Sequence, residues 1–331
     1  MALDPDRYRL SEADHQTIFE NGIKLERLSK ALPSVEPVAV IFGGQPGSGK
    51  TIAVDHAVQE LKRNGGSIQI IGDEFRSYHP GYGRLTGEDD KTAAFYTDRD
   101  TGSWVEKAIA YAKKQRFNIV IEGTMRDGDK VAATMESLRG AGYRIDARAL
   151  AVSFRLSEQG ILQRYEGQKA DRGVGRMTTP EAHRAAYDGM LTTLERIEGN
   201  RLADRMTIYR RGAVVLYANE LRGGDWMSEP RARAIVEAER SRPMSEAELR
   251  DYIDGFDRLI AMMTRPGRHA TDAEIKQVEM LRQSAQAVRG ISATDYWDNV
   301  AEQGRNSVAG KSEGVEQAQE RARRPGGRTL K

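Results

Sequence analysis

The stretch VAVIFGGQPGSGKT at residues 38–51 contains a complete P-loop, G-x-x-x-x-G-K-[ST], as Gly44-Gln45-Pro46-Gly47-Ser48-Gly49-Lys50-Thr51. The apolar run at 38–42 has the composition of a buried parallel strand that enters such a loop. Residues 52–61 follow with the apolar spacing of a helix. Glycines let backbone N–H groups turn inward around phosphates, and the start of the helix adds partial positive charge. The stretch therefore predicts an α/β protein that binds a nucleoside triphosphate.

Two side chains of this loop suit particular parts of the nucleotide. Lys50 supplies a cation for the β- and γ-phosphates, and Thr51 supplies a hydroxyl ligand for Mg²⁺. ATP and Mg²⁺ are the expected cofactors. The alternative is a glycine-rich turn without a ligand, but the complete pattern rarely arises by chance between such a strand and such a helix.

The composition narrows the class of protein. The 331 residues carry a net charge of +2, so overall charge gives no reason to expect nucleic acid or an anionic membrane as a partner. The chain has no cysteine, which excludes disulfides and thiol chemistry. The first ten residues lack an apolar signal segment, and no apolar run approaches the roughly 18 residues of a membrane span. We therefore expect a cytoplasmic protein.

Strand and helix patterns alternate along the chain as far as about residue 220. Besides 38–42, strands are expected at 67–71, 117–121 and 145–152, and helices at 10–32, 104–115, 129–139, 157–170 and 179–199. The segment 72–102 is rich in glycine, tyrosine and charge and is expected to be a loop. Residues 206–210 and 213–217 are expected to close the sheet as a hairpin. This alternation predicts a three-layer α/β/α fold of the P-loop NTPase type with a mostly parallel central sheet.

The character of the sequence changes after Gly223-Gly224. Residues 229–289 have charged, mildly amphipathic helical patterns, and residues 306–331 contain almost no large apolar side chains. We therefore expect a P-loop kinase domain at 1–224, a helical extension at 225–305 that packs on it, and a flexible tail at 306–331.

Acidic residues follow two of the expected strands. Asp73 comes just after the second strand and Glu122 ends the third, and ligands of parallel sheets bind beyond the carboxyl ends of the strands. Transfer to an alcohol needs one carboxylate to accept the hydroxyl proton and another to orient substrate or metal. The simpler alternatives are a helix cap for Asp73 and a structural ion pair with Arg126 for Glu122.

Two arginines bracket a charged, glycine-rich stretch between two expected helices. Small-molecule P-loop kinases often use such a stretch as a lid whose arginines reach the γ-phosphate. The guanidinium fork suits phosphoryl oxygens, so Arg164 and Arg176 are candidates. The alternative is that both are solvated surface residues.

Taken together, these motifs resemble the zeta toxin family in order and spacing. The matching segments are RLSEADHQTIF (9–19), GGQPGSGKT (43–51), IIGDEFRSYHP (70–80), VIEGTMR (120–126), QRYE (163–166) and GRMTTPEAH (175–183). The resemblance covers residues 8 to about 220. It implies the kinase half of a toxin–antitoxin pair, which phosphorylates the 3′-hydroxyl of the sugar of UDP-N-acetylglucosamine and so starves peptidoglycan synthesis. It also implies a small helical antitoxin as partner.

The resemblance also implies roles for single residues. Asp73 would be the general base, and Lys50, Arg164 and Arg176 would hold the ATP phosphates in the transition state. Substrate contacts would come from Asp73 together with Glu106, Glu122, Arg126 and Thr134.

Two departures keep other functions open. The segment 81–102 has its own character where the sugar nucleotide would be gripped, and the extension after residue 224 resembles nothing in the family. One alternative is a kinase of the same fold that acts on another alcohol, such as a dinucleotide, an antibiotic, another sugar nucleotide or a nucleic-acid end. A basic groove with exposed aromatic residues would be needed for the last of these. The other is a non-catalytic module that uses ATP binding to control an interaction.

Overall fold

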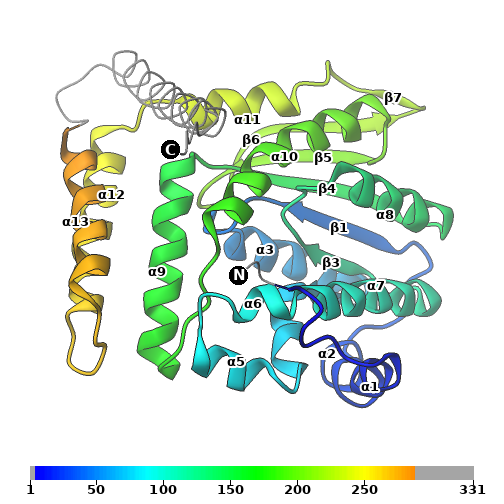
Figure 1. The fold of residues 1–331 in the computed structure, drawn as a ribbon. Helices are drawn as coiled ribbons and strands as arrows, with labels where there is room; N and C mark the ends of the chain where they lie inside the picture. Colours follow the sequence, from blue (N-terminus) through cyan, green and yellow to red (C-terminus); the bar gives the residue numbers. More distant parts are fainter. Residues whose placement is uncertain (1–3, 288–331) are drawn as a thin grey trace, which may run out of the picture. The chain divides into compact units, whose positions relative to one another are not determined.

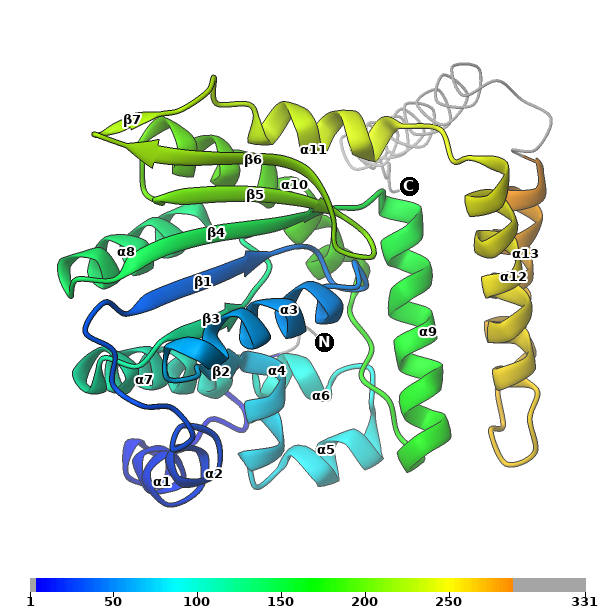
Figure 2. The same cartoon turned by 180° about the vertical axis from the view of Figure 1, so that it is seen from behind.

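The structure, a computed structural model, describes residues 4–287, and its α/β part is built on a seven-stranded sheet (Figures 1 and 2). The strand order is β2-β3-β1-β4-β5-β6-β7. The strands are β1 (Val38–Gly43), β2 (Ile68–Ile71), β3 (Ile119–Glu122), β4 (Arg144–Ala151), β5 (Arg205–Arg210), β6 (Val214–Arg222) and β7 (Asp225–Trp226). Neighbours are parallel from β2 to β5, whereas β6 and β7 are antiparallel. The predicted mostly parallel sheet and its closing hairpin, β5–β6, are confirmed.

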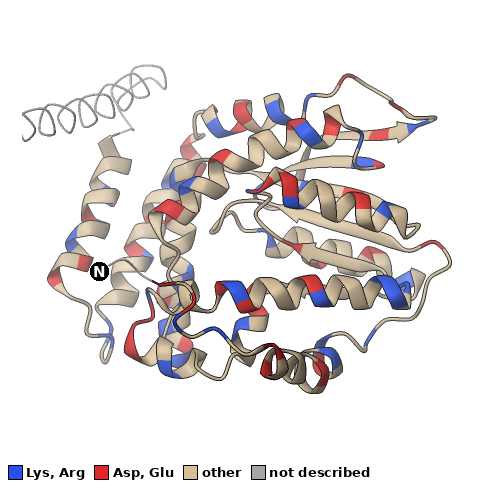
Figure 3. Cartoon of the chain, turned by 45° about the vertical axis from the view of Figure 1, so that its right-hand side comes forward, with Lys and Arg blue, Asp and Glu red and all other residues tan. Residues whose placement is uncertain are grey.

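Strand β1 explains the three layers. All six of its residues are buried, and alternate side chains of a strand point to opposite faces. Val38, Val40 and Phe42 join one apolar cluster with helix α3 (Thr51–Leu61). Ala39 and Ile41 join a second cluster with helices α7 (Asp98–Gln115), α8 (Gly128–Gly140) and α10 (Pro180–Gly199). Both faces of the sheet are therefore covered by helices. Figure 3 shows that the strands are mostly uncharged, whereas acidic and basic residues are distributed along the helices.

The helices of the α/β part follow the predicted order. They are α1 (Glu12–Ile18), α2 (Lys24–Arg27), α3 (Thr51–Leu61), α7 (Asp98–Gln115), α8 (Gly128–Gly140), α9 (Phe154–Arg172) and α10 (Pro180–Gly199). Ser11 caps α1 by accepting a hydrogen bond from the Asp14 N–H at 3.1 Å. A π-helical turn at Phe19–Ile23 joins α1 to α2, and this first helical segment ends at Arg27, five residues before its predicted end.

The segment 72–102, predicted to be a loop, is mostly helical. It folds into α4 (Gly72–Phe75), a 3₁₀ turn (Arg76–Tyr78), α5 (Tyr82–Glu88) and α6 (Ala93–Tyr96), and α7 already begins at Asp98. Phe75, Leu85 and Ala93 are buried and anchor three of these short helices. Their packing overrides the low helix propensity of the glycines, so the prediction was wrong here.

Helix α11 (Ala232–Ser241) lies beyond the predicted boundary at 224 and shares the core of the α/β part. Ala232 and Val236 are buried in the cluster that contains α10, and the Ala232 N–H donates to the Glu198 carboxylate at 2.8 Å. Residues 4–242 and 258–271 accordingly form one compact unit. The boundaries of the kinase domain and its extension stay predictions.

A second compact unit contains residues 243–257 and 272–287. It includes the first part of α12 (Glu246–Met263) and α13 (Asp272–Ala287), joined by an ion pair of 2.7 Å between Arg282 Nε and Asp257 Oδ1. The predicted tail at 306–331, and the end of the predicted extension, lie outside the described residues. Between residues 4 and 287 no helix is both long and apolar enough to cross a membrane.

Candidate active site

The P-loop connects β1 to α3 at the carboxyl edge of the sheet. Gly47 and Gly49 have φ angles of 77° and 81°, in the left-handed region that favours glycine. A Cβ atom on Gly47 would also lie 2.0 Å from the Ser157 carbonyl oxygen of α9. Both the backbone conformation and the close approach of α9 therefore require glycine at position 47.

A buried polar network holds the P-loop from behind. The Gln45 amide donates to the Val152 carbonyl at 2.7 Å and to Ser157 Oγ at 3.2 Å. Ser157 Oγ lies 2.8 Å from His183 Nε2, and Arg240 of α11 donates to Gln45 Oε1 at 3.4 Å. The loop is thus fixed by α9, α10 and α11 together.

His183 gives the P-loop support a pH dependence. Burial, reinforced by Arg184 and Arg240, lowers the pKa of His183 to about 4. The unfolded chain binds this proton near pH 6.5 and the folded chain does not, so stability is lost as pH falls below 6.5. Between pH 7 and pH 4 the wild type should lose up to about 3 kcal/mol more unfolding free energy than His183→Gln, by urea titration. Parallel pH curves for the two proteins would contradict this.

Lys50 is buried and lies between the P-loop backbone and strand β3. Its ammonium donates to the Gly44 carbonyl at 2.7 Å and lies 3.8 Å from the Glu122 carboxylate. Burial lowers the pKa of Lys50, and the negative charges of Glu122 and Asp73 oppose that shift. The ammonium is therefore held where the P-loop would bring phosphates.

The loop fits a nucleotide phosphate in a further respect. The Ser48 hydroxyl is fully buried and has no hydrogen-bond partner within residues 4–287. Thr51 is exposed at the first residue of α3, where a hydroxyl can reach a metal. No group of three or more acidic or histidine side chains in that range could hold a metal ion alone. A bound Mg²⁺ would have the Thr51 hydroxyl as one ligand, together with oxygens of the nucleotide.

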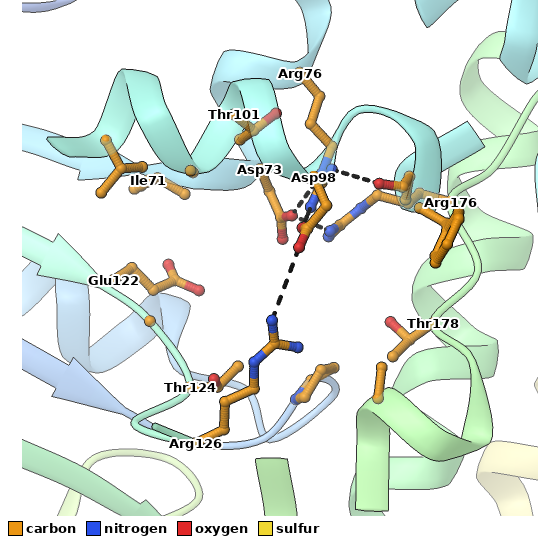
Figure 4. Close-up of a pocket in the computed structure, with 18 of the residues that line it drawn as sticks. Ile71, Asp73, Arg76, Asp98, Thr101, Glu122, Thr124, Arg126, Arg176 and Thr178 are labelled. Atoms are coloured by element: carbon orange, nitrogen blue, oxygen red, sulfur yellow. Dashed lines mark hydrogen bonds and ion pairs between the residues drawn. The ribbon is translucent and has the colours of Figure 1, made fainter. Parts of the chain in front are cut away.

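A cavity of about 670 Å³ opens beside the P-loop (Figure 4). It brings together most of the sequence-predicted site residues, namely Pro46, Lys50, Asp73, Glu106, Glu122, Arg126, Arg164 and Arg176. They come from the ends of β1, β2 and β3, from α7 and α9, and from the segment between α9 and α10. The remaining P-loop residues, Gly44, Gln45, Gly47, Ser48, Gly49 and Thr51, do not line it. Neither does Thr134.

Asp73 stands between two guanidinium groups in this cavity. Arg76 Nε lies 3.2 Å from Asp73 Oδ1, and Arg176 forms an ion pair with the same carboxylate oxygen. Burial raises the pKa of Asp73, but the charges of Arg176 and Arg76 outweigh it, so the pKa lies well below the usual range. The carboxylate, 42% exposed, is ionised and open to a ligand in the cavity.

The two candidate lid arginines, Arg164 and Arg176, both line the cavity. Arg164 of α9 donates to Thr178 Oγ1 at 2.8 Å. Burial, with the nearby charge of Arg176, lowers the pKa of Arg164 to about 10, so it stays protonated at neutral pH. Arg164 and Arg176 lie close enough for their charges to repel, and both line the cavity, so a bound anion there would be favoured.

Glu122 and Arg126 do not pair with each other, which the sequence left open. Glu122 faces Lys50, whereas Arg126 reaches across the cavity to Asp98, 3.8 Å away. Glu106 is exposed on α7 and lines the same cavity.

Thr134 lies in a second cavity, of about 530 Å³, between α7 and α8. Its hydroxyl donates to the Lys130 carbonyl at 2.8 Å. Apolar side chains such as Ile109, Ile121 and Val131 line most of this space, and Glu106 lines both cavities.

Sequence reasoning missed Asp98 and Arg76 as site residues. Arg76 is buried and donates to Asp98 Oδ1 at 2.7 Å, so it orients two carboxylates at once. The signal for Asp98 was present, because acidic residues favour the first turn of a helix. Because residues 72–102 were predicted to be a loop, the first turn of α7 at Asp98 was not recognised.

Comparisons with known proteins agree on one family. The family model described as Zeta toxin matches residues 24–222, a range that contains all the candidate site residues. Toxin PezT of Streptococcus pneumoniae serotype 4 is 31% identical over 211 residues, 63% of this chain and 81% of that protein. Toxin zeta of Enterococcus hirae is 28% identical over 275 residues, 81% and 92% of the two chains. A structure from the PezAT chromosomal toxin–antitoxin system of S. pneumoniae superimposes with a TM-score of 0.65 at 23% identity, covering 78% of this chain and 100% of that one.

Proposed function

The chain belongs to the zeta toxin family, and on that premise we propose that it is a kinase whose acceptor is UDP-N-acetylglucosamine. It would transfer the γ-phosphoryl group of ATP to the 3′-hydroxyl of the sugar. The observation that carries the proposal is one cavity in which an ionised Asp73 faces three cations, Lys50, Arg164 and Arg176. That arrangement matches the two needs of phosphoryl transfer to an alcohol, a proton acceptor and stabilisation of charge on the phosphoryl oxygens.

Each residue has a defined part in the proposed reaction. The sugar oxygen bonds to the γ-phosphorus, the bond to the β–γ bridging oxygen breaks, and ADP leaves. Asp73 accepts the hydroxyl proton. Lys50, Arg164 and Arg176 hold the non-bridging oxygens, where negative charge is spread in the transition state. Mg²⁺, held by Thr51 and the nucleotide, would neutralise part of the phosphate charge.

The acceptor assignment draws on the shape of the site. A sugar nucleotide is long, with a polar sugar diphosphate and a flat base. The cavities of about 670 Å³ and 530 Å³ share Glu106, one rich in charge and the other mostly apolar. We place the sugar near Asp73, Glu122 and Arg126, and the nucleoside toward Thr134. Family resemblance contributes the identity of the sugar nucleotide.

A panel of acceptors tests this function. Purified protein with ATP and Mg²⁺ is incubated with UDP-N-acetylglucosamine, UDP-glucose, a dinucleotide, an aminoglycoside antibiotic and a 5′-hydroxyl oligonucleotide. We expect UDP-N-acetylglucosamine to gain the mass of one phosphoryl group fastest. If only another alcohol of the panel were phosphorylated, the protein would be a kinase with a different acceptor. ATP binding without any transfer would favour the non-catalytic module.

Expression of this chain alone in a bacterium should arrest growth. Depletion of UDP-N-acetylglucosamine stops wall synthesis, so the expected result is lysis, relieved by Asp73→Ala. Culture density and viable counts after induction measure this. Continued growth with folded, ATP-binding wild-type protein in the cell would contradict toxicity.

We also propose a small helical antitoxin as partner. It would bind where ATP enters the cavity, near the P-loop and the start of the first helix at Ser11. Such a protein would exclude ATP by occupying its place. Equilibrium competition between ATP and the partner tests this, and simultaneous saturation by both would refute it.

A further inference from the structure

Asp90 lies in the short connection between α5 and α6, inside the segment that departs from the family pattern. Its side chain is 12% exposed and accepts hydrogen bonds from two residues of α9 and from one residue of the segment 173–179, which joins α9 to α10 and is called the lid below. Tyr165 Oη donates to Asp90 Oδ1 at 2.8 Å. The Gly175 N–H, at 3.2 Å, and Lys169 Nζ, at 3.1 Å, both reach Oδ2. One carboxylate therefore joins two turns of α9 to the segment that follows it.

The contacts of Asp90 surround Arg176. Three consecutive N–H groups of the lid are held from outside the lid: Gly175 by Asp90 Oδ2, Arg176 by Gln168 Oε1 at 2.8 Å, and Met177 by the Asp90 carbonyl at 3.5 Å. Asp90 thus fixes the backbone on both sides of the arginine whose side chain reaches Asp73.

Close packing against α9 adds to this restraint. A Cβ atom on Gly175 would lie 2.6 Å from the Tyr165 ring, so the lid backbone touches a ring that is 2% exposed. The same tyrosine carries the hydroxyl that Asp90 binds. The backbone of the lid is accordingly held in one position against α9.

We propose that Asp90 is a positioning residue that sets the lid backbone so that Arg176 reaches the transferring phosphoryl group. The inference rests on the proposed function and deepens it. Asp90 would act through the position of Arg176 rather than by touching the reacting groups itself. Arginine stabilises a phosphoryl transfer state only when its fork is aligned, and a displacement of about 1 Å can cost about 100-fold in rate.

Two of the three partners, Lys169 and the Gly175 N–H, require an acceptor at position 90, whereas the Tyr165 hydroxyl can donate or accept. Oδ1 and Oδ2 both act only as acceptors, one toward Tyr165 and the other toward Lys169 and Gly175. In Asp90→Asn the oxygen can still accept from Lys169 and Gly175 while the NH₂ group donates to the Tyr165 hydroxyl, so Asp90→Ala, which removes all three contacts, is the informative variant. The neighbouring Asp89 is the matched control. It is exposed, and its carboxylate accepts hydrogen bonds from Lys91 and Thr92 of its own turn.

The kinetic test is a double-mutant cycle. Asp90→Ala should lower kcat about 100-fold with the KM for ATP and acceptor within about threefold, whereas Asp89→Ala should leave kcat unchanged. In an Arg176→Ala background, Asp90→Ala should cause no further loss, because its effect passes through Arg176. An equal loss in both backgrounds would show general damage to the fold and overturn the proposal.

Hydrogen exchange gives a readout that does not depend on activity. Amides in 173–179 should exchange faster in Asp90→Ala than in the wild type and Asp89→Ala, while those of α3 keep their rates. Unchanged exchange of the lid amides would overturn the proposal even in an active enzyme. Faster lid exchange in a protein that phosphorylates no acceptor would uphold the role of Asp90 in holding the lid and refute the proposed function instead.

Discussion

Replacing Asp73 with asparagine should lower kcat for phosphoryl transfer by about 100- to 10,000-fold. The amide cannot take the hydroxyl proton, although it has nearly the shape of the carboxylate. Affinity for ATP should stay within about threefold, since a general base acts only when the hydroxyl is deprotonated. Single-turnover kinetics and equilibrium ATP binding separate the two quantities.

The adjacent acid provides the control for this variant. Glu74 is the next residue of α4, but it pairs with Arg27 outside the cavity at 3.1 Å, so Glu74→Gln should keep wild-type kcat. If Asp73→Asn weakened ATP binding as much as it slowed transfer, Asp73 would instead be a metal or structural residue. Because the pKa of Asp73 is low, this carboxylate stays ionised on the acid side of the pH profile. The acid limb should therefore follow unfolding rather than protonation of the base.

Replacing Lys50 with alanine should lower kcat by about 100- to 1,000-fold and also weaken ATP binding. The ammonium contacts phosphate in the ground state and in the transition state, so both quantities respond. Loss of one such donor costs about 100- to 1,000-fold in kcat. Isothermal titration with a non-hydrolysable ATP analogue measures the ground-state part.

Lys62 is the matched control for Lys50. It is exposed beyond the far end of α3, in a 3₁₀ turn, and does not line the cavity. Lys62→Ala should bind and react as the wild type does. Wild-type ATP affinity in Lys50→Ala would contradict the assigned phosphate contact, and wild-type kcat would contradict the site.

Local sequence was enough to predict the centre of the fold. Buried strands with apolar residues on both faces, such as β1, are readable because their burial is a property of a short continuous run. The P-loop is readable because its glycines and Lys50 serve one ligand at fixed spacing. The positions of Asp73 and Glu122 at one sheet edge then follow from parallel strand order.

What could not be predicted depends on contacts between distant segments. The short helices of 72–102 are stabilised by buried side chains such as Leu85 rather than by their own propensity. Asp90 gains its partners only when this segment meets α9, 75 residues away for Tyr165. Asp98 likewise pairs with Arg76 and Arg126 across the cavity. Such pairings have no periodic signal in the chain.

The most direct test of the central claim follows the labelled γ-phosphate of ATP into UDP-N-acetylglucosamine, in wild type and Asp73→Asn side by side. Phosphorus–proton coupling in the NMR spectrum of the product then locates the new phosphate on the sugar. We predict label on the 3′-oxygen with the wild type and almost none with the variant. Label that appears only as inorganic phosphate, or equally with both proteins, would contradict the account.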